Sequence, residues 1–211
     1  MILDKPIKEF LDNLASGEPT PGGGSVAALV GATAAALVSM VCNISRKNKN
    51  TPTENIDKLN QIQQKSEQLR TYLQELVQQD VDAFDDYMSS LKLPQNTEEE
   101  KIIRQEAIEH SVEKATLVPL RIIEHSAEVL KLAKEVLPLA VKSVVSDVGI
   151  AAIMAESAMH TSMFNIEINL ANCENDEFAD KVFDRVDEVM DEVEDLTQEI
   201  IDAVQDIIYE I

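Results

Sequence analysis

Apolar side chains recur at steps of three and four residues through the middle of the chain, and this spacing constrains the fold most. The stripe consists of Leu59, Ile62, Ser66, Leu69, Leu73, Leu76, Asp80, Ala83 and Tyr87. Such steps place every member on one face of an α-helix, the face that turns toward a protein interior. No segment shows the alternation that is typical of strands. The sequence therefore predicts an all-α protein.

Capping and breaking residues predict where the helices begin and end. Each expected start carries an early proline or a side-chain oxygen that can accept a bond from a free backbone N–H. The expected starts are Pro6, Ser25, Thr51, Thr97 and Ser146–Asp147, the stops lie near Gly17, Leu93 and Pro138, and Pro119 either kinks the fourth helix or begins a fifth. Helices of up to about 40 residues exceed the usual length of roughly 12 and need long partners. We therefore expect one domain over residues 1–211, a bundle of long helices that forms an intertwined or side-by-side homodimer.

The charge is acidic and unevenly distributed. The formal net charge is −21, and residues 174–211 hold 15 Asp and Glu against only Lys181 and Arg185, a net of −13. Apolar residues still recur at helical spacing through this segment, from Val182 to Ile207, which predicts one amphipathic helix. Phosphate groups would be repelled by such a protein, so we expect neither nucleic acid nor an anionic membrane surface as a partner.

Residues 19–45 carry no charge, and residues 25–44 are long enough to span a bilayer. Only eight of those twenty residues are large aliphatic side chains, and most of the others are alanine or small polar residues. A helix that is apolar all round can equally be the central helix of a soluble bundle. We favour the buried helix.

Two cysteines and three histidines give no disulfide framework and no metal-ligand spacing. We expect Cys42 and Cys173 to be free, buried thiols. No metal or organic cofactor is expected. Charged residues interrupt the first segment, so no secretory signal is predicted and a cytoplasmic location is expected.

Asp80 occupies a position in the stripe where an apolar side chain belongs. A carboxylate there loses water and must be hydrogen-bonded or paired. Buried carboxylates of this kind are candidate proton-transfer groups. The alternatives are a polar residue that fixes helix register, or a stripe that reaches solvent at this point.

Three further groups are candidates for ligand binding. The glycine-rich segment 21–25 precedes a helix, so its backbone N–H groups can approach a flat or anionic ligand closely, or it is only a flexible connector. Asn165 and Asn169 share one helix face and could hold a heterocycle's polar edge, or bond a neighbouring helix. The basic island Arg46, Lys47 and Lys49 either complements the helix dipole or binds a ligand's carboxylates.

Six short blocks between residues 5 and 175 carry a resemblance to a known family. They are Pro-Thr-Pro-Gly-Gly-Gly-Ser-Val-Ala-Ala (19–28), Asp-Val-Asp-Ala-Phe (80–84), Leu-Pro (93–94) with Arg104, Val-Pro-Leu (118–120), Ser-Asp-Val-Gly-Ile-Ala-Ala (146–152) and Asn-Ile-Glu-Ile-Asn-Leu (165–170). Together they resemble the formiminotetrahydrofolate cyclodeaminase family, whose close relatives include methenyltetrahydrofolate cyclohydrolases. The resemblance implies an all-helical homodimer that binds a reduced folate.

The resemblance also implies residue roles. It makes Asp80 the catalytic aspartate, and it places Gly22, Gly23, Gly24, Ser25, Asp147, Asn165 and Asn169 in the folate pocket. The implied reaction converts 5-formimino-tetrahydrofolate to 5,10-methenyl-tetrahydrofolate and ammonia, with one carboxyl moving the N10 proton to the departing nitrogen. The alternatives are methenyltetrahydrofolate cyclohydrolase activity in the same pocket and a non-catalytic acidic helical interaction module.

Overall fold

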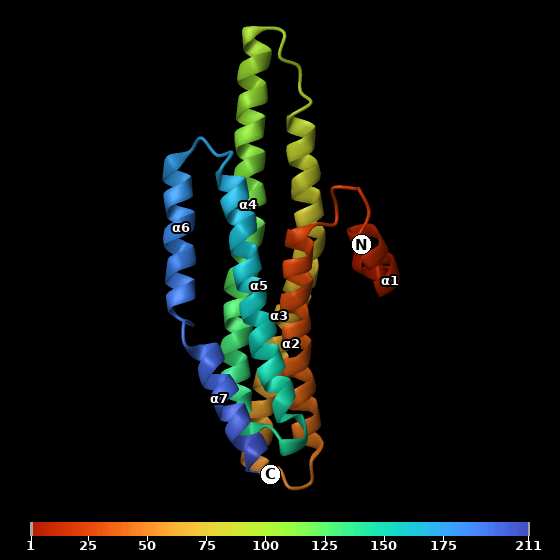
Figure 1. The fold of residues 1–211 in the computed structure, drawn as a ribbon, viewed down its shortest axis with the longest axis vertical. Coiled ribbons are helices and arrows are strands. Elements are labelled where there is room, and N and C mark those ends of the chain that lie inside the picture. The colour runs from red at the N-terminus through yellow and green to blue at the C-terminus, as the bar shows by residue number, and fades with distance from the viewer. Residues whose placement is uncertain (1, 211) are drawn as a thin grey trace.

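The computed structural model describes residues 2–210, which form one bundle of long helices without a strand among them (Figure 1). The all-α prediction is therefore confirmed. The bundle consists of α2 (Gly23–Lys47), α3 (Thr53–Ser90), α4 (Glu98–Val136) and α5 (Val145–Leu170). Three short helices, α1 (Ile7–Leu14), α6 (Asp176–Asp191) and α7 (Leu196–Tyr209), lie outside it, and the 3-10 turns are η1 (Ile2–Asp4), η2 (Leu137–Leu139) and η3 (Lys142–Val144).

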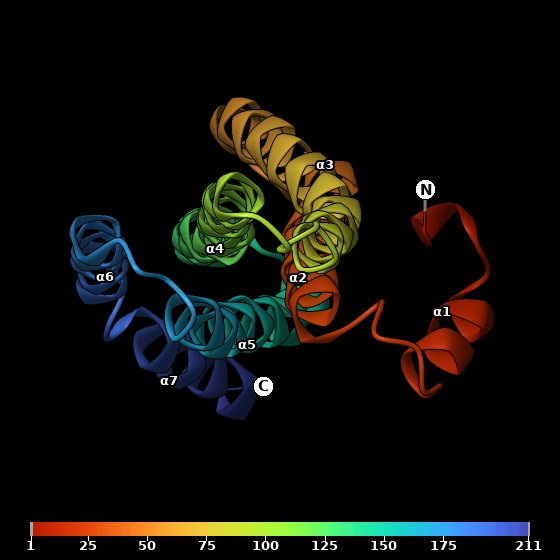
Figure 2. The same cartoon turned by 90° about the horizontal axis from the view of Figure 1, so that it is seen from above.

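Helix α2 lies at the centre and packs against α3, α4 and α5 (Figure 2). Most of its buried residues are glycine, alanine or serine, which lets the neighbouring backbones come close. By length and composition α2 could also cross a membrane, and 61% of its most apolar stretch is buried inside the bundle. Its place matches the expected central helix.

The predicted stripe of α3 faces the interior. Leu59, Ile62, Leu73 and Leu76 are all buried. Ser66 is buried as well, and its hydroxyl donates to the backbone carbonyl of Ala35 in α2 at 2.6 Å. The stripe therefore faces the interior, as its spacing predicted, and Ser66 is hydrogen-bonded across the contact between α3 and α2.

The expected starts of α2 and α5 were placed too far along the chain. Helix α2 begins at Gly23 with Gly22 at the cap, so Ser25 lies inside the first turn. Helix α5 begins after Val144, which offers no side-chain bond, and Asp147 lies in the first turn instead of capping it. In both cases the backbone enters the helix earlier than the polar residue, which leaves that side chain free for another contact.

The two expected capping boxes had different outcomes. The box at Thr97 is confirmed, because Glu100 N–H donates to Thr97 Oγ1 at 3.2 Å and Thr97 N–H donates to the Glu100 carboxylate at 3.1 Å. The box at Thr51 does not form. Its hydroxyl donates to the Ser45 carbonyl at 2.6 Å, and Pro52 takes the cap position.

Two further boundaries differ from expectation. Helix α4 runs without a break through Pro119, so no fifth helix begins there. The acidic C-terminal segment forms α6 and α7 rather than one helix, and its apolar residues Val182, Val186, Val189, Ile200 and Val204 are buried. Ion pairs tie these helices to α4, among them Lys131–Glu192 at 2.6 Å and Arg185–Glu124 at 2.7 Å.

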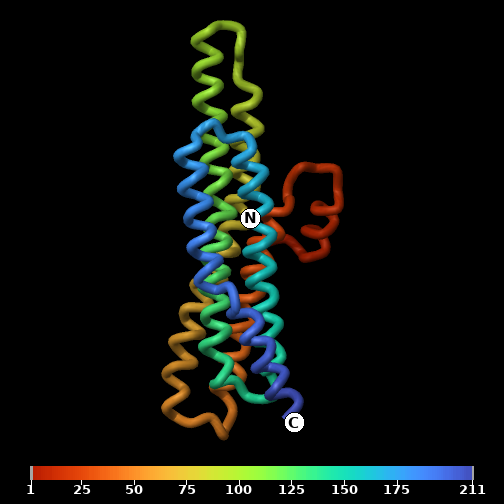
Figure 3. Tube along the Cα trace, turned by 60° about the vertical axis from the view of Figure 1, so that its left-hand side comes forward, coloured from red at the N-terminus to blue at the C-terminus, as the bar shows by residue number. Residues whose placement is uncertain are grey.

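The upper ends of α3 and α4 project beyond the other helices as a hairpin (Figures 1 and 3). Helix α2 begins level with Asp80 of α3, because Gly24 and Asp80 are in contact there. Above that level the bundle loses one of its four helices. The candidate site lies at this level, where α2 is absent from the bundle.

Candidate functional site

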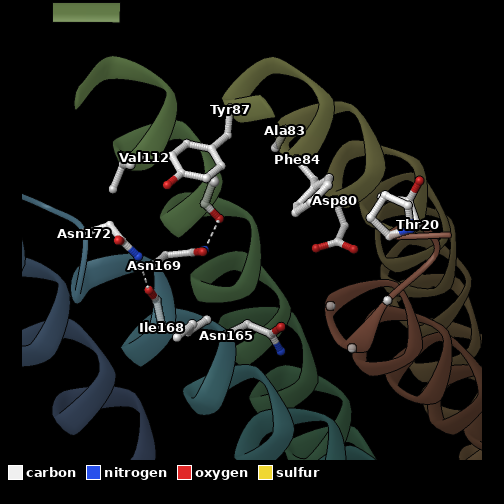
Figure 4. A pocket seen from close by; sticks show the side chains of 15 residues that line it. Thr20, Asp80, Ala83, Phe84, Tyr87, Val112, Asn165, Ile168, Asn169 and Asn172 are labelled. Atoms are coloured by element: carbon white, nitrogen blue, oxygen red, sulfur yellow. Dashed lines mark hydrogen bonds between the residues drawn. The ribbon is translucent and has the colours of Figure 1, made fainter. Parts of the chain in front are cut away.

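A cavity of about 320 Å³ lies above the N-terminus of α2, between α3, α4 and α5 (Figure 4). This size falls within the range of small-molecule sites. The lining residues are Pro19, Thr20, Gly22, Gly23, Gly24, Asp80, Ala83, Phe84, Tyr87, Val112, Ala115, Asn165, Ile168, Asn169 and Asn172. Six of the eight residues that the sequence assigned to a folate site line this one cavity.

Asp80 is the one carboxylic acid among the lining residues of the cavity. It is partly buried, and Ser25, which is fully buried, donates its hydroxyl to Asp80 Oδ2 at 2.7 Å. Burial raises the pKa of the Asp80 carboxyl, while the side-chain and backbone hydrogen bonds from Ser25 lower this pKa. A carboxyl whose pKa is raised toward the working pH can accept and return a proton. Ser25 acts behind Asp80 and does not itself line the cavity.

Gly24 allows this close approach of α2 to Asp80. A Cβ at position 24 would lie 2.7 Å from the Asp80 Cγ and closer still to its Oδ1. A Cβ at Gly23 would meet the Asn165 side-chain oxygen at 3.5 Å, and one at Gly22 would meet the Pro19 carbonyl at 3.6 Å, both ordinary contacts. Of the three glycines, only Gly24 has no room for a Cβ atom.

Asn165 and Asn169 present amide groups to the same cavity from α5. Asn165 Nδ2 donates to the Thr161 carbonyl at 2.9 Å, and Asn169 Nδ2 donates to the Ala115 carbonyl of α4 at 3.1 Å. These bonds orient the two amides, so each side-chain oxygen is left as an acceptor. No lysine or arginine is among the lining residues. Among the lining side chains, Asp80, Asn165 and Asn169 therefore present acceptor oxygens, while the first turn of α2 adds backbone N–H donors.

Phe84 and Tyr87 form an aromatic wall that sequence reasoning missed. They follow Asp80 by four and seven residues on α3 and so share its face (Figure 4). Their spacing was the available signal, but aromatic residues on a stripe are usually core residues. At this level of α3, α2 no longer packs against it. The two rings therefore line the cavity and offer a flat ligand an apolar surface.

Asp147 does not belong to this cavity within one chain. It precedes Asn165 by 18 residues on α5, which is about 27 Å at a helical rise of ~1.5 Å per residue. The basic island also lies far from the cavity, at the other end of α2. There Arg46 donates to Asn60 at 2.6 Å and to Asn43 at 2.8 Å.

Neither cysteine lies among the lining residues of the cavity. Cys42 is a free, buried thiol, as expected, and burial raises its pKa to about 12. Cys173 is free but only partly buried. Among residues 2–210, no group of three or more His, Cys, Asp or Glu side chains is placed to hold a metal ion.

Residues 6–206 match the family model described as Formiminotransferase-cyclodeaminase. The chain belongs to this family. It is 40% identical over 178 residues to the methenyltetrahydrofolate cyclohydrolase of Methylorubrum extorquens, covering 84% of this chain and 85% of that protein. It is 30% identical over 186 residues to the formimidoyltransferase-cyclodeaminase of Rattus norvegicus, covering 88% of this chain but only 34% of that protein.

The fold is also shared with a solved member of the family. The crystal structure of the formiminotetrahydrofolate cyclodeaminase of Thermotoga maritima superimposes with a TM-score of 0.87 at 26% identity. The match covers 99% of this chain and 100% of that one. The resemblance stated from the sequence blocks is thus confirmed, and the relatives carry the names of two different folate reactions.

Proposed function

We propose that the chain is a folate one-carbon enzyme that hydrolyses 5,10-methenyl-tetrahydrofolate to 10-formyl-tetrahydrofolate. Sequence reasoning placed cyclodeamination first. We reverse that order because the relative named cyclohydrolase has the higher identity and is matched along most of its length. The observation that carries the proposal is the Asp80 carboxyl, held in a small-molecule cavity by Ser25 with its pKa raised by burial.

In this reaction water attacks the methenyl carbon that bridges N5 and N10. Asp80, ionised, takes one proton from the attacking water and delivers it to N5 as the bond between carbon and N5 breaks. The remaining hydroxyl proton goes to solvent as the formyl C=O forms on N10, so one proton is released overall. The methenyl bridge carries a positive charge, so the Asp80 carboxylate and the side-chain oxygens of Asn165 and Asn169 favour binding of the substrate cation.

The rings of the substrate match the remaining walls. The reduced pterin is flat and rich in N–H donors, which fits the free oxygens of Asn165 and Asn169. Phe84 and Tyr87 cover its apolar face. Gly22 and Gly23 leave the backbone of the loop open to close approach.

Cyclodeamination of 5-formimino-tetrahydrofolate is the second candidate, supported by the fold match to a cyclodeaminase. Here N10 attacks the formimino carbon and ammonia leaves. The same carboxyl would take the N10 proton and pass it to the departing nitrogen. The assays differ, because hydrolysis removes the methenyl chromophore whereas cyclodeamination creates it and releases ammonia.

The test is the Asp80→Asn variant with both purified substrates. We expect turnover to fall by about 10² to 10⁴, the usual contribution of a general acid–base group, with an unchanged circular dichroism spectrum. Asp82→Asn, an exposed neighbour on α3, is the control and should retain activity. Full activity in Asp80→Asn would remove Asp80 from the mechanism.

Several expectations remain part of this proposal. The reaction needs neither a metal nor an organic cofactor, so EDTA should leave turnover unchanged. The enzyme acts as a homodimer in the cytoplasm, with a reduced folate as its ligand and without a nucleic acid or membrane partner. If calorimetry shows that the chain binds neither folate, the chain is interpreted as a non-catalytic acidic helical interaction module and not as an enzyme.

A further inference from the structure

Two rows of side chains line the cavity from opposite helices with the same spacing. One row lies on α3 and the other on α5, and each has members at positions i, i+4 and i+7, which share one helix face. The rows are Asp80, Phe84 and Tyr87 on α3, and Asn165, Asn169 and Asn172 on α5 (Figure 4). Above Asp80, the cavity therefore has an aromatic wall and a wall of amides.

The two rows are level with each other. At their lower end both meet the start of α2, because a Cβ at Gly24 would contact Asp80 and a Cβ at Gly23 would contact Asn165. From there α3 and α5 both run upward (Figure 1). The last members of the two rows therefore share the upper end, seven residues above Asp80 on α3, which is about 10 Å at a helical rise of ~1.5 Å per residue.

The upper end offers a free donor and a free acceptor. Asn172 Nδ2 donates to the Ile168 carbonyl at 3.0 Å, so the side-chain oxygen of Asn172 is left as an acceptor. The Tyr87 hydroxyl makes no hydrogen bond to any of residues 2–210, although Tyr87 lines the cavity and is partly buried. A phenol can donate its proton to a ring nitrogen. A ligand edge that has an acceptor beside a donor would satisfy both groups.

The two ends of the cavity differ in the charge of their surroundings. Within two residues of the upper lining residues along the chain lie four carboxylates and one lysine, and that lysine is already paired with one of the carboxylates. These residues are Asp85, Asp86, Glu113 and Glu174, with Lys114 paired to Asp86. Residues 19–26, which border the lower end, carry no charge. The α2 N-terminus also adds the positive end of a helix dipole there.

We propose that the cavity holds a reduced pterin lengthwise, with its 2-amino edge at Tyr87 and Asn172 and its anionic tail leaving past Thr20. This step rests on the proposed function, because it takes a reduced folate as the ligand. The edge in question carries ring nitrogen N1 beside the 2-amino group, which is an acceptor beside a donor. The Tyr87 hydroxyl donates to N1, and the Asn172 side-chain oxygen accepts from the 2-amino group.

This orientation gives each part of the ligand suitable surroundings. The fused rings lie between Phe84 and the Asn169 amide. The bridging carbon is on the side of the pterin opposite the 2-amino group, so it reaches Asp80. The glutamate carboxylates leave beside the uncharged residues 19–26. The reversed orientation would bring the tail carboxylates toward the acidic residues around the upper end, where like charges repel.

The contacts at the upper end are tested by removing each polar group. Tyr87→Phe removes only the hydroxyl, and Asn172→Ala removes the amide. Each variant should raise KM for methenyl-tetrahydrofolate about tenfold and change kcat little, because the lost hydrogen bond is equally strong before and during the reaction. Tyr72→Phe is the matched control, since Tyr72 lies on the same helix and stacks on His125 outside the cavity. An unchanged KM in both variants overturns the proposal.

A modified substrate separates a direct contact from a change in cavity shape. In the 2-desamino-2-methyl analogue of methenyl-tetrahydrofolate, a methyl group replaces the amino group and N1 is kept. Asn172→Ala should equal wild type with this analogue, because the group that Asn172 binds is already gone. Tyr87→Phe should still raise KM, because N1 remains. An equal effect of Asn172→Ala on both substrates would overturn its contact with the amino group.

The orientation is tested by adding a negative charge at either end. Thr20→Asp should raise KM for methenyl-tetrahydrofolate several-fold, because the new carboxylate repels the glutamate tail. It should affect the methenyl-tetrahydropteroate analogue, which has no glutamate, much less. Asn172→Asp keeps an acceptor for the 2-amino group, so KM for both substrates should stay close to wild type. A loss in Asn172→Asp that depends on the glutamate would show the reversed orientation.

Calorimetry with tetrahydrofolate separates this proposal from the proposed reaction. The wild-type chain should bind tetrahydrofolate, and Tyr87→Phe should weaken binding about tenfold whether or not the chain catalyses a reaction. Binding that is equally tight in wild type, Tyr87→Phe and Asn172→Ala overturns the orientation and leaves the proposed reaction standing. If the wild-type chain binds no reduced folate, the proposed function and the orientation both fail.

Discussion

Asp80 of α3 and Gly24 of α2 are in contact although they are 56 residues apart in sequence, and the Asp80 carboxyl fills the space that a side chain at position 24 would need. Gly24→Ala should therefore push the carboxyl away from Ser25 and the cavity. We expect turnover to fall at least about 100-fold, the lower range for losing a general acid–base group, with the helix content retained. Gly22→Ala is the control, because its added Cβ meets only the Pro19 carbonyl at 3.6 Å. Equal activities for the two variants would contradict the steric account.

The hydrogen bond from Ser25 makes a prediction about pH. To accept a proton Asp80 must be ionised, so kcat/KM falls as the pH drops through its pKa. Burial raises this pKa and the Ser25 hydroxyl lowers it. Ser25→Ala removes a group that stabilises the ionised form, so the acid limb of the pH profile should move to higher pH. Ser89→Ala, an exposed hydroxyl on the same helix as Asp80, should leave the limb in place. A shift of the Ser25→Ala limb to lower pH would exclude this role.

Single residues were predictable where they broke a local pattern. Asp80 interrupts an apolar stripe, so its burial and its shifted pKa followed from spacing. Gly24 could not be told apart from Gly22 and Gly23, because only its contact with a distant helix distinguishes it. Tyr87 lies on the stripe and Phe84 beside it, so both look like core residues, and they line a cavity only because α2 does not extend above the level of Asp80.

At the scale of helices, Gly31 permits the close packing of α2 on its neighbours. A Cβ there would lie 2.8 Å from the Ser126 hydroxyl and 3.2 Å from a Leu73 methyl. Overpacking costs about 1–3 kcal/mol, which exceeds the gain of about 1 kcal/mol from replacing helical glycine. Gly31→Ala should therefore lower the free energy of unfolding in urea.

Two comparison variants separate packing from helix propensity. Gly149→Ala lies inside α5, where the new Cβ meets Val204 at an ordinary 3.5 Å, so it should be neutral or stabilising. Ser126 has a buried hydroxyl without a hydrogen-bond partner. Ser126→Ala should make room and recover part of the stability lost in Gly31→Ala. A stabilising Gly31→Ala would show that the neighbours move apart easily.

Helix ends were predictable only where the cap is local. The Thr97 box is confirmed because both of its partners lie within four residues. The Thr51 hydroxyl bonds the end of α2, and the Ser25 hydroxyl bonds Asp80 in α3, so tertiary contacts took the groups that propensity had assigned to caps. Asp147 lies in the first turn of α5, at the end of this helix that is far from the cavity.

For the whole molecule, periodicity and length predicted a bundle of long helices, and the bundle was found. The cavity was not predictable, because it depends on how far α2 and α5 are shifted along α3 and α4. The break between α6 and α7 was missed as well. The apolar spacing continues through it, and the helices separate where residues 192–195 turn to keep both apolar faces on the bundle.

Net charge gives the last prediction. The chain carries −21, of which residues 174–211 carry −13 on α6, α7 and the residues beside them. Exposed ion pairs such as Lys131–Glu192 stabilise by about 0–1 kcal/mol each and weaken in salt. Repulsion among the surplus carboxylates is also screened, since the Debye length falls to about 3 Å at 1 M. The unpaired carboxylates outnumber the ion pairs, so salt should relieve more repulsion than it weakens ion-pair attraction.

We therefore expect the unfolding midpoint to rise by a few degrees between about 20 mM and 500 mM NaCl, as repulsion is screened. Sodium chloride is used because sulfate would stabilise by exclusion from the surface. Replacing the exposed Asp184 and Asp187 of α6 with lysine should raise the midpoint at low salt and reduce its salt dependence. A midpoint that falls with salt would mean that the ion pairs joining α4 to α6 and α7 outweigh the repulsion, and the double variant would then show a steeper fall.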